Sequence, residues 1–160
     1  MLAGLNVLAS DLDPKMVKGT EENLQWVSED LCSGYSATWD VQESGVGLTP
    51  DVWGKISGAI FAFDPPYGLN SWKSDDGFQL LVDSLSSCAE VATDYARLTA
   101  LLPLPPAALS LNLLGEDINN PICVTLGKQW NEIVEKIHET GWRIDTFTTI
   151  PVHKSLARLL

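Results

Sequence analysis

Five consecutive residues, Asp64-Pro65-Pro66-Tyr67-Gly68, directly follow the apolar segment Gly58–Phe63 and could hold a nucleobase amine. Because proline has no N–H, a free carbonyl stands beside the Asp64 carboxylate as a second acceptor. Together these two groups could accept both hydrogens of one exocyclic amino group. Tyr67 offers an aromatic face on which a flipped base can stack, a contact worth ~1–3 kcal/mol. The same residues could form a simple proline-rich turn, but the aromatic ring, the glycine and the preceding strand favour the chemical interpretation.

Two further carboxylates follow segments that have the pattern of strands. Asp11 comes directly after Leu5–Ser10, and Asp40 comes directly after Tyr35–Trp39. In open, mostly parallel sheets, ligands bind beyond the carboxyl ends of the strands. The pattern therefore places Asp11, Asp40 and Asp64 at the ligand-binding edge of such a sheet.

Strand-like and helix-like segments alternate along the chain, which predicts an α/β fold built from βαβ units around a mostly parallel sheet. The expected strands are Leu5–Ser10, Tyr35–Trp39, Gly58–Phe63, Arg97–Leu102, Trp142–Ile150 and His153–Leu160. The expected helices run from Pro14 to about Ser28, over Phe78–Thr93 and over Lys128–Thr140, with Asp13 as N-cap of the first and Gly141 just past the third. Pro103 is expected to stop the fourth strand and Pro151 to separate the last two. Residues 107–121 allow no assignment, and no domain boundary is visible.

Composition excludes several classes of protein. The chain has 160 residues, of which 45% are hydrophobic and 19% charged, so it is not disordered, collagen-like or a coiled coil. No apolar run reaches the ~18 residues of a membrane-spanning helix, and no secretory signal follows Met1. Cys32, Cys88 and Cys123 are too widely spaced for a disulfide framework or a zinc site. We therefore expect a cytoplasmic protein with no metal and no membrane partner.

The net charge of −11 comes from 10 Lys+Arg against 21 Asp+Glu. Phosphate contacts are made by Lys and Arg, so this chain cannot bind nucleic acid by general attraction. A role on nucleic acid would need a small local site, a basic domain outside this sequence, or a salt-rich cytoplasm that screens the repulsion.

Three motifs together resemble one enzyme family. Asp64–Gly68 resembles the (Asp/Asn/Ser)-Pro-Pro-aromatic motif of amino-methylating, S-adenosylmethionine-dependent methyltransferases. Residues 9–17, followed by Glu22-Asn23-Leu24, are similar to the second-strand region of THUMP-associated RNA methyltransferases. The ending Val152–Arg158 resembles that of the archaeal tRNA guanine-10 N2-methyltransferases, which methylate the guanine 2-amino nitrogen.

The resemblance implies a role for each matched residue. Asp11 would bind the ribose hydroxyls of S-adenosylmethionine, with Asp13 as a competitor that lies further from the strand. Asp40 would bind the adenine amino group, although a plain turn is nearly as good an interpretation. Asp64, Pro65, Pro66 and Tyr67 would form the catalytic site for the guanine amine, and tRNA would be the partner. The implied fold is a Rossmann-like class I methyltransferase sheet, mostly parallel with an antiparallel late strand.

Parts of that family's domain have no counterpart in residues 1–160. These are the first strand, its Gly-rich loop and the N-terminal THUMP domain. We therefore expect a partial catalytic domain, inactive alone, from a longer enzyme whose N-terminal half is missing here or, as a less favoured option, supplied by a second chain. The alternatives are a DNA adenine-N6 or cytosine-N4 methyltransferase, which shares the Asp-Pro-Pro-aromatic motif, and a non-catalytic remnant of the fold.

Overall fold

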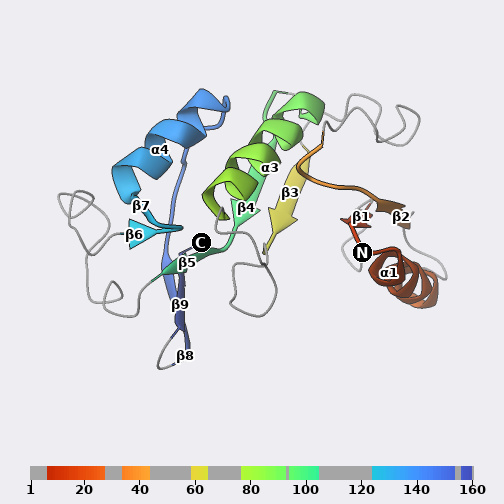
Figure 1. Cartoon of the computed structure of the whole chain (residues 1–160). Coiled ribbons are helices and arrows are strands. Elements are labelled where there is room, and N and C mark those ends of the chain that lie inside the picture. The colour runs from red at the N-terminus through yellow and green to blue at the C-terminus, as the bar shows by residue number, and fades with distance from the viewer. Residues whose placement is uncertain are drawn as a thin grey trace. The chain divides into compact units, whose positions relative to one another are not determined.

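The structure is a computed structural model that describes residues 7–27, 34–43, 59–64, 77–92, 94–104, 124–153 and 156–159 (Figure 1). The chain divides into two compact units, residues 1–54 and 55–160. Each unit is described by itself. Both mix helices with strands, which confirms the predicted α/β class.

The first unit is a single βαβ motif. Strand β1 (Val7–Asp11) and strand β2 (Gly34–Thr38) pair in parallel, joined by helix α1 (Pro14–Val27). In their described parts, these three elements lie where the sequence predicts them. The register sets Val7 opposite Gly34 and Asp11 opposite Thr38, so the carboxyl ends of both strands lie at one edge.

Helix α1 begins at the residues expected to begin it. The Asp13 carboxylate accepts a hydrogen bond from the backbone N–H of Lys15 at 2.8 Å, which caps the free amides of the first turn. Pro14 occupies the first helical position, where its missing N–H costs nothing. Gly19 lies inside the helix with no atom within 4 Å of where a Cβ would stand, so packing does not require a glycine there.

The second unit begins with another βαβ motif. Strand β3 (Ile60–Phe63) and strand β4 (Arg97–Ala100) pair in parallel and are joined through helix α3 (Gly77–Val91). Phe61 and Leu98 turn towards the helices, whereas Ile60 on the opposite face is 69% exposed. Only one face of this strand pair is therefore covered by the described residues.

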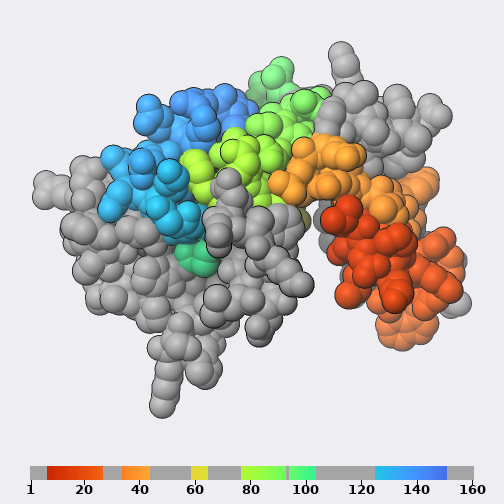
Figure 2. Space-filling view, viewed as in Figure 1, coloured from red at the N-terminus to blue at the C-terminus, as the bar shows by residue number. Residues whose placement is uncertain are grey.

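The core of the second unit lies between the strands and two helices, α3 and α4 (Trp130–Glu139). Its buried residues are Leu81, Leu85, Leu102, Trp130 and Ile133. Figure 2 shows the side chains of α3 in green and those of α4 in blue packed side by side. Trp142 joins this core, because its indole N–H donates to the Leu85 carbonyl at 2.9 Å.

Three late strands form an antiparallel sheet in the order β5 (Leu102–Leu104), β9 (Leu156–Leu159), β8 (Thr149–His153). Strand β9 is thus antiparallel to both of its neighbours, in a sheet whose described strands form no parallel pair. The predicted strand end at Pro103 is wrong, since this residue lies inside β5. Among the described residues β5 pairs only with β9, so Pro103 sits at a sheet edge where a missing N–H is tolerated.

Pro151 likewise lies inside β8 rather than between two strands. Among the described residues β8 pairs only with β9, so this proline is also at a sheet edge, where its missing N–H is tolerated. Residues 142–148, which were expected to begin this strand, precede it without a strand partner.

The start of the last helix also differs from the prediction. Lys128–Gln129 form strand β7, which pairs with β6 (Val124–Thr125) in a short hairpin, and α4 begins only at Trp130. Gln129 and Glu132 close a reciprocal capping box that fixes this boundary. The end of the helix is as predicted: Gly141 follows the C-cap with a φ of +88°, a conformation that favours glycine. The ambiguous residues 107–121 lie outside the described residues.

Candidate functional site

The structure brings two of the predicted site residues, Asp11 and Asp40, to the same edge of the first unit. Asp11 is the last residue of β1, and its carbonyl accepts from the backbone N–H of Trp39 at 3.1 Å. Asp40 directly follows Trp39 in the sequence. The two carboxylates therefore belong to adjacent strand ends at the carboxyl edge of a parallel pair, which is where such sheets bind ligands.

The Asp11 carboxylate is exposed and only partly engaged. One oxygen, Oδ1, accepts from the backbone N–H of Asp13 at 2.8 Å, which holds the side chain in a fixed turn. The other oxygen makes no hydrogen bond to the described residues. Asp13, the competing candidate, directs its own carboxylate to the N-terminus of α1. The geometry favours Asp11 over Asp13 as a ligand-binding group.

Asp40 is half-buried and lies in a tight turn. Its Oδ1 accepts from the backbone N–H of Gln42 at 2.9 Å, and its carbonyl accepts from Glu43 at 2.9 Å. These bonds orient the carboxylate without neutralising its charge, so it can still accept from an amino group.

Trp39, between these two strand ends, was not singled out by the sequence as a site residue. Its indole Nε1 is buried and has no acceptor among the described residues. Buried donors are almost always paired, so this indole N–H is an exception among the described residues. In the sequence, Trp39 could have been noticed as an aromatic residue with an N–H donor directly before the predicted ligand-binding residue Asp40.

Asp64 lies in the second unit, directly after β3, as predicted. It is exposed. The Leu101 N–H donates to the Phe63 carbonyl at 3.3 Å, so the carboxyl ends of β3 and β4 are aligned beside it. The remaining catalytic candidates, Pro65, Pro66 and Tyr67, lie outside the described residues.

Asp64 does not line the large cavity of the second unit, which is formed by α3, β4 and residues 142–148. That cavity is a separate feature. Within the described ranges no group of three or more His, Cys, Asp or Glu side chains could hold a metal ion. No helix in this part of the chain is long and apolar enough to cross a membrane.

Comparison with known proteins does not identify a family. No family model matches the chain, and no curated protein matches it significantly.

Proposed function

We propose that this chain is part of an S-adenosylmethionine-dependent N-methyltransferase that acts on the exocyclic 2-amino group of a guanine in tRNA. The observation that carries the proposal is the position of the three acids. Asp11, Asp40 and Asp64 each lie at or just beyond the carboxyl end of a strand that pairs in parallel, which is the ligand-binding edge of open α/β sheets.

The strand arrangement supports the implied Rossmann-like sheet. In the second unit, β3 and β4 are parallel and are connected through a helix, as in a βαβ crossover. The chain then adds β9 in the antiparallel sense between β5 and β8. The two parallel strand pairs and the antiparallel β9 support the proposed sheet, although the described strands form separate small sheets.

The first unit fits the adenosine part of the cofactor. The Asp11 oxygen that makes no hydrogen bond to the described residues can accept from ribose hydroxyls, and Asp40 can accept from the adenine amino group. When bound, S-adenosylmethionine supplies an electrophilic methyl group on its sulfonium.

The role of Asp64 is to position and stabilise the guanine amine. Its carboxylate and the Pro65 carbonyl would each accept one amino hydrogen, which orients the nitrogen towards the methyl group. Positive charge develops on that nitrogen as it attacks, and the anionic carboxylate stabilises it. Tyr67 would stack on the guanine ring.

A further strand is part of this proposal. Among the described residues β1 pairs only with β2, and β3 pairs only with β4, so each keeps one edge without a partner. An apolar strand edge of this kind is normally paired or covered. We propose that the longer enzyme supplies the family's first strand and its Gly-rich loop, and that its RNA-binding domain compensates for the acidity of this chain.

The product identifies the function. The full-length natural polypeptide that carries this sequence would be incubated with labelled S-adenosylmethionine and either unmodified tRNA or duplex DNA. We expect label in N2-methylguanosine from tRNA. Label in N6-methyladenine or N4-methylcytosine from DNA would favour a DNA methyltransferase. No transfer to either acceptor, by an enzyme that still binds the cofactor, would favour a non-catalytic remnant.

A further inference from the structure

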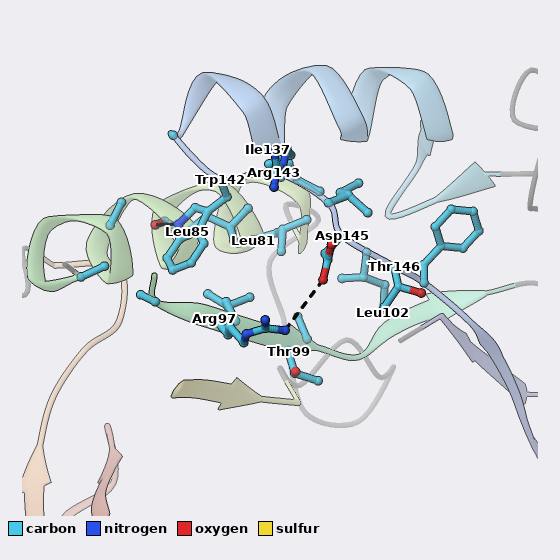
Figure 3. Close-up of a pocket in the computed structure, with 18 of the residues that line it drawn as sticks. Leu81, Leu85, Arg97, Thr99, Leu102, Ile137, Trp142, Arg143, Asp145 and Thr146 are labelled. Carbon is cyan, nitrogen blue, oxygen red and sulfur yellow. Dashed lines mark hydrogen bonds and ion pairs between the residues drawn. The ribbon is translucent and has the colours of Figure 1, made fainter. Parts of the chain in front are cut away.

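We draw no further inference here: the strongest candidate, the open apolar cleft between β4 and residues 142–148 of the second unit (Figure 3), carries none, because nothing in the part of the chain that the structure describes shows what covers it.

Discussion

Removal of the Cys88 thiol should change how stability depends on pH. Cys88 lies on the buried face of α3 and is only 3% exposed. This burial raises the pKa of the thiol from 9.0 to about 11, because the thiolate loses its hydration. The unfolded chain therefore releases the Cys88 proton at a lower pH than the native protein does. The contribution of the Cys88 thiol to the free energy of unfolding is therefore fully present below pH 9 and is lost as the pH rises towards 11.

The size of the effect follows from this pKa difference. Between pH 9 and 11 the free energy of unfolding falls by about 1.4 kcal/mol per pH unit, so the loss from pH 7 to pH 10 is roughly 1.4 kcal/mol. The Cys88→Ala variant has no thiol to titrate, so its free energy of unfolding does not fall for this reason between pH 9 and 11. The substitution also leaves a small cavity, which lowers the free energy of unfolding by about 1 kcal/mol at every pH.

Urea unfolding followed by tryptophan fluorescence at pH 7, 9 and 10 checks the prediction. We expect Cys88→Ala to be less stable than the natural protein at pH 7 and nearly equal to it at pH 10. Groups that titrate elsewhere cancel in the difference between the two proteins. A constant difference from pH 7 to 10 would refute the reasoning, since it would mean that the thiol is not desolvated in the native state.

Four other substitutions test local features of the fold and site. Gly19→Ala should raise the free energy of unfolding by up to about 1 kcal/mol in urea titrations, because the site is helical and has open space for a methyl group. Gly141→Ala should lower it by about 1 kcal/mol, because the residue has a φ of +88°. In the full-length enzyme, Asp11→Ala should weaken S-adenosylmethionine binding at least tenfold by calorimetry. The matched Asp13→Ala should instead destabilise α1 by about 1 kcal/mol in thermal melts and leave cofactor affinity within twofold.

Local sequence patterns located the elements that are stabilised locally. Helix α1 was predicted closely, since Asp13 and Pro14 fix its start through adjacent backbone groups. Strand β3 was predicted because its short apolar run is typical of a strand that packs against a helix. The positions of the candidate acids at strand ends were predicted for the same reason, since the end of a strand can be recognised from the residues next to it.

Features that depend on partners far along the chain were not predictable in this way. Pro103 and Pro151 are tolerated inside strands because, among the described residues, both strands lie at sheet edges, and edge position depends on which strands pair. The lack of an acceptor for the Trp39 indole among the described residues can be recognised only when the groups around it are placed.

The rate of methyl transfer by the full-length enzyme, with Asp64 replaced, tests the central proposal most directly. Asp64→Ala should lower kcat at least about 100-fold, because it removes the anionic acceptor of the guanine amine. Asp64→Asn should retain part of the rate, since its amide oxygen still accepts a hydrogen bond. The control Glu135→Ala, an exposed acid of α4, should stay within twofold of the natural enzyme. If a correctly folded Asp64→Ala enzyme transferred methyl groups as fast as the unsubstituted enzyme, the proposal that Asp64 holds the guanine amine would be contradicted.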